Sequence, residues 1–369
     1  MRGFAASPRR RRRQPLPALA PLGRIYLWVA RAHHAAYDRG WRSEARIGVP
    51  VISIGNVTAG GTGKTPAALW LTGELADRGH AVGIVSRGYR GRRAEDPLVV
   101  ARDGRLLAHP SEAGDEPVML AQGTAARVVT VGRDRASAAR LARDAGADVL
   151  ILDDGFQHRR LHRDLDIVLV DAADPFGGGR GLPAGLLREP PGALLRADLL
   201  LLTRCPPDMP GGGRLPTSAL PGPLRELLSR AAPSAAPPVF ATRHEPDALQ
   251  RADGSWAPAN ALAGRRVLAV SGIGRPDDFV ATLERTGAIV ADHLAWSDHH
   301  RYDRADARTI EQHAARARAE LIVTTSKDAV RWPAGAPRPA VLRIALSVPG
   351  GPEIVERVME TIRRFERLA

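Results

Sequence analysis

The sequence predicts an α/β fold: a mostly parallel sheet with helices on both faces, a smaller C-terminal α/β domain and an N-terminal amphipathic helix. Three observations support this prediction. Short apolar runs alternate with helix-like segments through the first 205 residues, as in parallel sheets. A stretch rich in Pro, Gly and Ala follows at residues 206–238, and the alternation then resumes. The 369 residues also suit two domains of roughly 150 residues each.

Residues 1–46 are predicted to be a basic leader and a membrane-associated amphipathic helix. They contain 11 arginines, including the run Arg9–Arg13, against two acidic residues. From Leu22 to Tyr37 apolar side chains recur every three or four residues, as on one face of a helix. The apolar stretch Leu16–Ala30 is interrupted by prolines, a glycine and Arg24 and is shorter than the ~20 apolar residues that cross a bilayer. Neither a signal peptide nor a membrane span is therefore expected.

Two arrangements of this helix fit its periodicity. It can pack on the protein's own core, or it can lie in the interface of a bilayer. The nearby arginines favour the bilayer, because each cation close to an anionic leaflet contributes on the order of 1 kcal/mol. We therefore expect a monotopic contact on the cytosolic face of a membrane.

Residues 47–205 are predicted to form the larger domain, in which strands alternate with helices. Ligands of such sheets bind at the carboxyl ends of the strands. The expected strands are Pro50–Ile54, Ala81–Val85, Val128–Val131, Val149–Leu152, Ile167–Val170 and Leu199–Leu202, and the expected helices are Pro66–Arg78 and Ala136–Ala145.

Residues 206–238 are predicted to be an irregular connection, and residues 239–369 a smaller α/β domain. A last amphipathic helix, Glu353–Arg367, could dock on either domain. The other expected elements of this domain are strands at Val267–Val270, Ile289–Ala291 and Leu321–Thr324 and helices at Asp277–Thr286 and Arg304–Ala319.

Composition excludes several classes of protein. The net charge of +13 resides mostly in residues 1–46, which carry +9, and aromatic residues make up only 4% of the chain. A nucleic-acid binder would need basic and aromatic side chains throughout the body, so no nucleic-acid partner is expected. Cys205 is the single cysteine, which rules out an intrachain disulfide and a cysteine-based zinc cluster and fits a reducing cytosol. Only two of the 53 basic residues are lysines, Lys64 and Lys327.

A phosphate-binding loop, or P-loop, directly follows the first expected strand and opens a helix. Glycines let backbone N–H groups converge on phosphate oxygens, Lys64 reaches the β and γ phosphates, and Thr65 can bind Mg²⁺. Thr58 stands where the usual pattern has Gly, and the alternative is a glycine-rich turn before a helix. The P-loop residues are Thr58, Ala59, Gly60, Gly61, Thr62, Gly63, Lys64 and Thr65.

Two acidic pairs are candidates for metal binding and acid–base chemistry. Asp153 and Asp154 end a four-residue apolar run, which would bring them beside the P-loop as anchors for Mg²⁺. A simple turn is the alternative. Asp115 and Glu116 lie between Gly114 and Pro117; alone, this pair would indicate a loop or a helix start with Asp115 as cap.

A polar segment of the second domain carries two adjacent histidines, His299 and His300. Their side chains diverge, so joint metal binding is disfavoured. Phosphoryl transfer needs positioning, charge neutralisation and a base for the attacking hydroxyl. A carboxylate–histidine pair can supply that base.

Seven motifs in the same order resemble those of the tetraacyldisaccharide 4′-kinase family, the lipid A 4′-kinases of Gram-negative bacteria. The resemblance runs from about Leu22 to Val330, and this family's P-loop also lacks the first Gly. The Arg9–Arg13 run and the 206–238 segment lie outside the family pattern. The motifs are Gly55–Pro66, Ser86–Tyr89, Gly114–Pro117, Asp153–His158, Leu182–Gly185 with Leu187–Pro190, Asp298–His299 and Thr325–Asp328.

The resemblance implies transfer of the ATP γ-phosphate to the 4′-hydroxyl of a tetraacylated glucosamine disaccharide 1-phosphate, which gives lipid IVA. The reaction would take place at the cytosolic face of the inner membrane, where the N-terminal helix would hold the site at the bilayer. No obligate protein partner is implied.

The resemblance also implies roles for individual residues. Asp115 would be the base and would pair with His299, and Lys64 and Asp154 would assist transfer. Which carboxylate acts as base and which binds metal stays open. The Mg²⁺ ligands would come from Thr65, Glu116, Asp153 and Asp154, and the rim of the substrate site from Arg87, Tyr89, Gln157 and His158.

A P-loop switch or partitioning ATPase is the alternative function. A guanine-specific switch would have Asn-Lys-x-Asp, which Ser326-Lys327-Asp328 does not match. The partitioning class would have Lys in place of Ala59. Lys327 itself is left with two possible roles, a nucleotide contact or a pair with Asp328.

Overall fold

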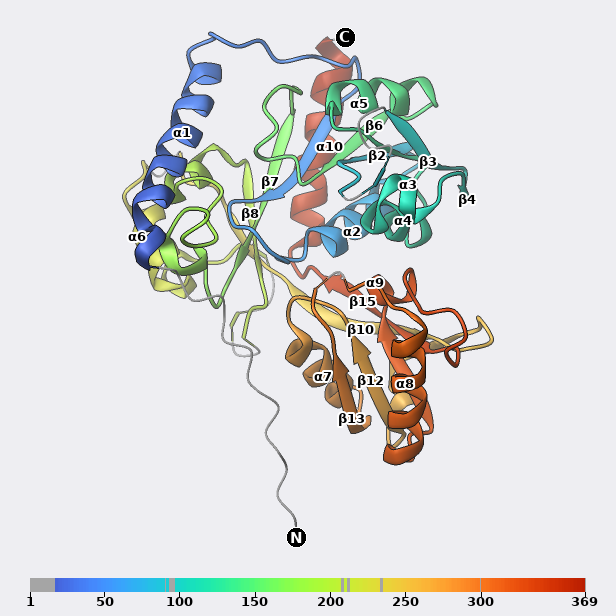
Figure 1. Ribbon diagram of the computed structural model, residues 1–369. Helices are drawn as coiled ribbons and strands as arrows, with labels where there is room; N and C mark the ends of the chain where they lie inside the picture. Colours follow the sequence, from blue (N-terminus) through green and yellow to red (C-terminus); the bar gives the residue numbers. More distant parts are fainter. Residues whose placement is uncertain are drawn as a thin grey trace.

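The computed structural model describes residues 17–89, 91–92, 97–206, 209–210, 213–232, 235–298 and 300–368. These residues form two sheets, and the first lies with helices on both faces (Figure 1). The expected α/β architecture is confirmed. In spatial order, the nine strands described in the first sheet are β4 (Arg105–Leu106), β3 (Leu98–Arg102), β5 (Val128–Val131), β2 (Val82–Ser86), β6 (Val149–Asp153), β1 (Val51–Asn56), β7 (Leu165–Asp171), β8 (Leu199–Thr203) and β9 (Val239–Ala241).

The first sheet is parallel from β5 to β9, and only β3 and β4 at one edge run antiparallel. Its central strands are buried along their whole length, as their continuous β-branched and leucine runs require. The helices around it are α1 (Ala20–Asp38), α2 (Lys64–Ala76), α3 (Pro110–Ala113), α4 (Asp115–Gln122), α5 (Arg135–Asp144), α6 (Gly222–Ser229) and α10 (Gly351–Leu368), with 3-10 turns at Pro17–Leu19, Gly177–Gly179, Pro191–Arg196 and Thr217–Ala219.

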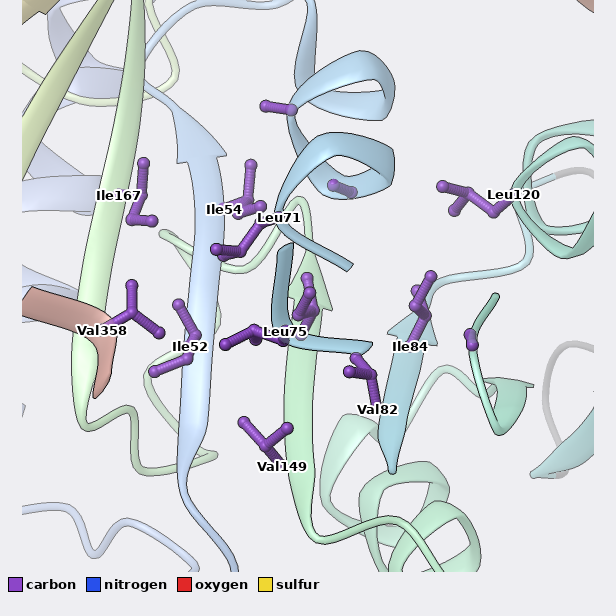
Figure 2. Packing of buried hydrophobic residues seen from close by; sticks show 14 of the residues in the cluster. Ile52, Ile54, Leu71, Leu75, Val82, Ile84, Leu120, Val149, Ile167 and Val358 are labelled. Atoms are coloured by element: carbon purple, nitrogen blue, oxygen red, sulfur yellow. The ribbon is translucent and has the colours of Figure 1, made fainter. Parts of the chain in front are cut away.

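The main core lies between α2 and the first sheet. Leu71 and Leu75 of α2 pack against Ile52 and Ile54 of β1, and Figure 2 shows these side chains together with Val358 of α10. Each of the five is buried, and burying one such side chain contributes roughly 1.5–3 kcal/mol. This packing fixes the start of α2, and therefore the P-loop, against the end of β1.

The second sheet is mixed. Its strands β12 and β14 carry the apolar runs expected from the sequence, whereas β10 and β15 pair antiparallel and are only half-buried. In spatial order, the six described strands are β11 (Trp256–Pro258), β10 (Arg243–Gln250), β15 (Ala340–Ser347), β14 (Leu321–Thr325), β12 (Arg266–Ser271) and β13 (Ile289–Ala295), and the helical segments are Ala259–Leu262, α7 (Pro276–Arg285), α8 (Arg304–Ala317) and α9 (Ser326–Ala329).

The chain passes between the sheets twice. Thr242, fully buried, separates β9 of the first sheet from β10 of the second. After β15 the chain returns, and Ile354, Val358 and Ile362 of α10 join the core cluster of α2. Figure 1 shows α10, in red, beside the first sheet and apart from the orange second sheet. The domain limits drawn from the sequence stay a prediction.

The described part of residues 206–238 is more ordered than its composition indicates. It contains α6, and four leucines from it are buried in a cluster with β8. Because prolines and glycines interrupt the sequence between these leucines, their spacing does not show a clear helical period. The four are Leu215, Leu220, Leu224 and Leu228.

Helix α1 lies close to its expected limits but turns its apolar stripe away from the protein. Gly23, Leu27 and His34 face inward, and a Cβ on Gly23 would lie 2.7 Å from the carbonyl oxygen of Gly181. The outward side chains include Trp28, which is 70% exposed. The Arg9–Arg13 run lies outside the described residues. The other exposed apolar residues of this helix are Leu22, Ile25, Tyr26 and Val29.

None of the described helices combines the length and the apolar composition that a bilayer crossing requires.

Candidate active site

The predicted P-loop lies between β1 and α2, at the carboxyl end of a central parallel strand. The side-chain amide of Asn56 donates a 2.9 Å hydrogen bond to Thr62 Oγ1, and both residues are buried. Gly63 has a left-handed backbone with φ +92°, and a Cβ there would lie 2.5 Å from His244 Nε2. In the described structure no side chain caps the start of α2. The first N–H groups of α2 are thus available to an anion.

Lys64 and Thr65 open α2. The ammonium of Lys64 lies 3.4 Å from Asp154 Oδ1. This contact brings together the two motifs that the sequence placed at the same edge of the sheet. At the other end of the loop, the backbone N–H of Ala59 donates to the carbonyl oxygen of Leu186 at 2.7 Å, which ties the P-loop to the Leu182–Pro190 region.

Asp153 is the last residue of β6 and is only 5% exposed. Ser86, at the end of the neighbouring β2, donates to its Oδ2 at 3.0 Å. Burial, together with the negative charges of Asp154 and Glu116, raises the pKa of Asp153 to about 7. Negative charge here is therefore incompletely balanced by the protein, as expected at a site for a cation.

Asp154 has a different environment from its neighbour. Its backbone is left-handed, with φ +54°, and Arg188 Nη1 donates to both carboxylate oxygens, at 2.9 and 2.8 Å. Burial alone would raise the pKa of Asp154, but the charges of Lys64 and Arg188 outweigh it and lower the pKa. Asp154 is therefore held ionised by two cations.

Asp115 and Glu116 begin α4, at the side of the site nearest the second sheet. Gly114 is the N-cap, so Asp115 is the first helical residue rather than the cap. Asp115 Oδ2 lies 3.5 Å from Arg331 Nε, and Glu116 Oε1 lies 4.0 Å from Lys327 Nζ. Both cations come from the segment that follows β14 in the second sheet.

The predicted histidine of the site, His299, lies outside the described residues. Its neighbours are described. Asp298 Oδ1 is 3.0 Å from Lys327 Nζ. His300 Nε2 is 2.7 Å from Asp306 Oδ2, and its ring stacks on Trp296. His300 is thus engaged within the second sheet's own packing.

The four predicted rim residues divide into two kinds. Arg87 and Tyr89 are exposed after β2. Gln157 instead supports the P-loop, because its amide donates to Asn56 O at 2.8 Å and to Glu189 Oε1 at 2.9 Å. His158 is partly buried, and burial, helped by the charge of Arg135, lowers its pKa to about 4. His158 is therefore neutral at pH 7.

Glu189 is a central residue that the sequence analysis quoted within a motif without assigning a role. It is 1% exposed and accepts from Gln157 and from Arg196 Nη1, the latter at 2.9 Å. His34 of α1 lies 3.2 Å away, and burial lowers the pKa of His34 to about 4. Glu189 therefore lies between His34 of α1 and Gln157, which supports the P-loop.

Arg204, directly after β8, is another residue of the site to which the sequence analysis assigned no role. It donates to the carbonyl oxygen of Gly61 in the P-loop. Its Nη1 also lies 2.6 Å from Asp171 Oδ2, an oxygen that accepts from Arg275 of the second-sheet region at 2.9 Å. No motif signalled this contact between the P-loop and the second sheet.

Within the described residues, no group of three or more His, Cys, Asp or Glu side chains is arranged to hold a metal ion by itself. A metal bound here would therefore need ligands from elsewhere as well, such as Thr65 and substrate phosphates. This is how Mg²⁺ is usually held in phosphoryl-transfer enzymes.

Comparisons with known proteins agree on one family. The family described as "LpxK: Tetraacyldisaccharide-1-P 4'-kinase" matches residues 16–363. A tetraacyldisaccharide 4′-kinase from Anaeromyxobacter dehalogenans (strain 2CP-C) is 43% identical over 373 residues, covering 97% of this chain and 95% of that protein. One from Syntrophus aciditrophicus (strain SB) is 45% identical over 298 residues, covering 80% of this chain and 78% of that protein.

A solved structure agrees as well. The "apo" form of LpxK from Aquifex aeolicus in complex with ATP superposes with a TM-score of 0.73 at 29% identity and covers 94% of this chain and 98% of its own. With nearly full coverage in sequence and in structure, the chain belongs to the tetraacyldisaccharide 4′-kinase family.

Proposed function

We propose that this protein transfers the γ-phosphate of ATP to the 4′-hydroxyl of a tetraacylated glucosamine disaccharide 1-phosphate, which gives lipid IVA. Membership of the kinase family supports the reaction, and the structural relative in complex with ATP supports the donor. A switch or partitioning ATPase is not favoured, because the relatives are kinases along almost the whole chain.

One observation carries the proposal: the P-loop and the acidic residues of β6 and α4 meet at one edge of the first sheet. Lys64 contacts Asp154 at 3.4 Å, and the charge of Glu116 helps raise the pKa of Asp153. A phosphate donor, a cation and a base for an attacking hydroxyl can therefore be accommodated within one site. Kinase chemistry needs little else from the protein.

The P-loop would bind the phosphates of ATP. Its backbone N–H groups and the uncapped start of α2 supply positive potential. Lys64 would exchange its contact with Asp154 for the β and γ phosphates, and Arg188 would keep Asp154 ionised after that exchange. The Asn56–Thr62 hydrogen bond would hold the loop in shape.

Asp153 and Thr65 are the residues best suited to hold Mg²⁺, with Asp154 and Glu116 completing the negative environment. Asp153 suits this role because it is buried and its charge is poorly balanced within the protein, whereas Asp154 already pairs with two cations. When bound, Mg²⁺ would neutralise charge that develops on the transferred phosphoryl group.

Asp115 would accept the proton of the 4′-hydroxyl, and His299 would assist it. Asp115 suits a base because it opens α4 at the edge of the site and contacts a single buried cation in the described structure, Arg331. Arg87 and Tyr89 are exposed beside this region and are suited to contact the sugar or its phosphate. Gln157 and His158 would act mainly through the P-loop and the sheet.

The outward stripe of α1 would hold the enzyme at the cytosolic face of the inner membrane. Ile25 and Trp28 are 59% and 70% exposed, although apolar groups of this size are normally buried. The substrate carries acyl chains that remain in a bilayer. A helix lying in the interface would therefore keep the site next to its substrate.

The decisive experiment incubates the purified protein with labelled ATP, Mg²⁺ and the disaccharide 1-phosphate in detergent. We expect a labelled lipid that carries a second phosphate, and far slower formation of this product by Lys64→Ala at equal protein concentration. Folding of both proteins is checked by circular dichroism and ATP binding by calorimetry. A folded, ATP-binding native protein that yields no labelled lipid would refute the proposal.

A further inference from the structure

Arg331 joins three separate parts of the molecule. Its Nε donates to the carbonyl oxygen of Lys327 at 3.3 Å and lies 3.5 Å from Asp115 Oδ2 of the first-sheet region. Its Nη1 donates to the carbonyl oxygen of His300 at 2.8 Å, and its Nη2 donates to Asp328 Oδ1 at 3.0 Å. The side chain is 7% exposed. Each of its three nitrogens therefore has its own acceptor, which fixes the plane of the guanidinium.

We propose that Arg331 is a positioning residue that sets the Asp115 carboxylate against the backbone of His300, in the connection between β13 and α8. The inference rests on the proposed function, in which Asp115 is the base. Arg331 would not touch substrate. Its effect would be exerted through Asp115 and through the backbone of His300.

The anchor of Arg331 is rigid. Asp328 is fully buried and accepts hydrogen bonds from Tyr302 OH at 3.2 Å and Thr325 Oγ1 at 2.7 Å. Its own backbone N–H donates to Thr325 Oγ1. Because Asp328 is fixed by these contacts, it can hold one side of the guanidinium while the other side reaches α4. Buried charges are paired in this way because an unpaired one is costly.

Lys327 makes a parallel contact four residues earlier. Its Nζ lies 3.0 Å from Asp298 Oδ1 and 4.0 Å from Glu116 Oε1. Two cations thus face the two adjacent acids that begin α4. Arg331 is the better buried of the two and contacts the proposed base, so it is expected to matter more for turnover.

The geometry separates turnover from ATP binding. Arg331 contacts no P-loop residue among its described partners. Its loss should leave the binding of ATP intact, while Asp115 and the backbone of His300 lose their common support. A shift of the order of 1 Å in a reacting group can cost about 100-fold in rate.

The first test compares Arg331→Gln and Arg331→Lys with the control Arg343→Gln. Arg343 pairs with Asp247, both side chains are exposed, and neither belongs to a site motif. We expect Arg331→Gln to lower turnover about 100-fold with little change in the KM for ATP. Arg331→Lys should recover only part, because an ammonium cannot keep three divergent acceptors. The control should match the native protein.

A double-mutant cycle with Asp115→Asn distinguishes positioning from general stability. If Arg331 acts through Asp115, then Arg331→Gln should cost far less turnover in the Asp115→Asn background than in the native one. A loss that is equal in both backgrounds, to within about twofold, would overturn the inference. So would native turnover in Arg331→Gln.

Folding is followed by urea unfolding and ATP binding in every variant. If Arg331→Gln does not fold, Arg331→Lys takes its place in the cycle with the same expectations. The proposed function fails if the native protein makes no labelled lipid. The positioning role alone fails if the native protein is active and the cycle is additive.

Discussion

The two sheets of this protein differ in how deeply their strands are buried. In the first sheet β1, β6 and β7 are buried at every position. In the second, β10 and β13 are half-exposed along most of their length. The first sheet carries the P-loop and Asp153, and the second sends Lys327 and Arg331 across to α4.

This difference in burial indicates that the two halves of the site are held in position in different ways. The phosphate-binding groups come directly after buried strands along the chain. Close packing fixes the positions of these strands. The groups contributed by the second sheet are held mainly by ion pairs and hydrogen bonds, such as those of Asp328. Substitutions should therefore affect the first region through packing and phosphate contacts, and the second through charge and geometry.

The largest difference between the two regions is expected for the two lysines of the chain, because Lys64 lies in the first region and Lys327 in the second. Lys64→Ala should lower kcat/KM by roughly 10²- to 10³-fold, because a preorganised cation at the phosphates is lost. Lys327→Ala should cost much less, since its carboxylates are partly exposed. Steady-state kinetics on both variants provides the measurement. Equal losses would mean that the second region is as critical for phosphate handling as the first.

Shortening one apolar side chain in each of the two regions tests the same difference through the free energy of unfolding. Leu71→Ala should lower the free energy of unfolding by about 2–5 kcal/mol, because the side chain is fully buried. Leu294→Ala on half-buried β13 should cost less, about 1 kcal/mol, since part of that side chain is already hydrated. Urea unfolding of both variants gives the comparison. A larger cost for Leu294→Ala would contradict the assigned difference in burial.

A substitution on helix α1 tests whether its exposed apolar side chains bind a membrane surface. Trp28→Glu should weaken sedimentation with anionic vesicles about tenfold, since a large apolar group is lost from the interface. Turnover in detergent should not change. Leu106→Glu, an equally drastic change at an exposed leucine on β4, should leave sedimentation intact. Equal vesicle binding by Trp28→Glu and the native protein would exclude α1 as the contact.

The smallest effect is expected for an exposed ion pair of the second sheet. Arg343→Gln breaks a pair with Asp247 in which both side chains are largely exposed. Such pairs contribute about 0–1 kcal/mol, and less in salt. Urea unfolding at low and high ionic strength checks this value. A cost above that of Leu294→Ala would mean that charge, rather than burial, stabilises this sheet.

Much of the first sheet could be predicted from the sequence. Buried parallel strands are continuous apolar runs, so Val149–Asp153 and its neighbours are easily recognised. The strand β10 could not be predicted, because it mixes charged and apolar residues and includes Pro246. The four-residue helix α9 is too short for any periodicity.

The residues of the candidate site could be predicted only where they belong to a short local motif. The P-loop and both acidic pairs were identified because each motif lies within a few consecutive residues. Arg188, Glu189 and Arg331 act through partners 34, 32 and more than 200 positions away. No spacing rule joins residues so distant, and only the folded chain shows which carboxylate each guanidinium contacts.

The order of the elements along the chain has a consequence for synthesis. Helix α10 completes the core around α2, yet it is translated after the whole second sheet. The first sheet therefore cannot complete the core on its α2 face until residues 351–368 have left the ribosome, whereas β10 to β15 can pair before then. A chain that ends before α10 would carry a paired second sheet beside an exposed apolar surface, and proteolytic quality control would remove it.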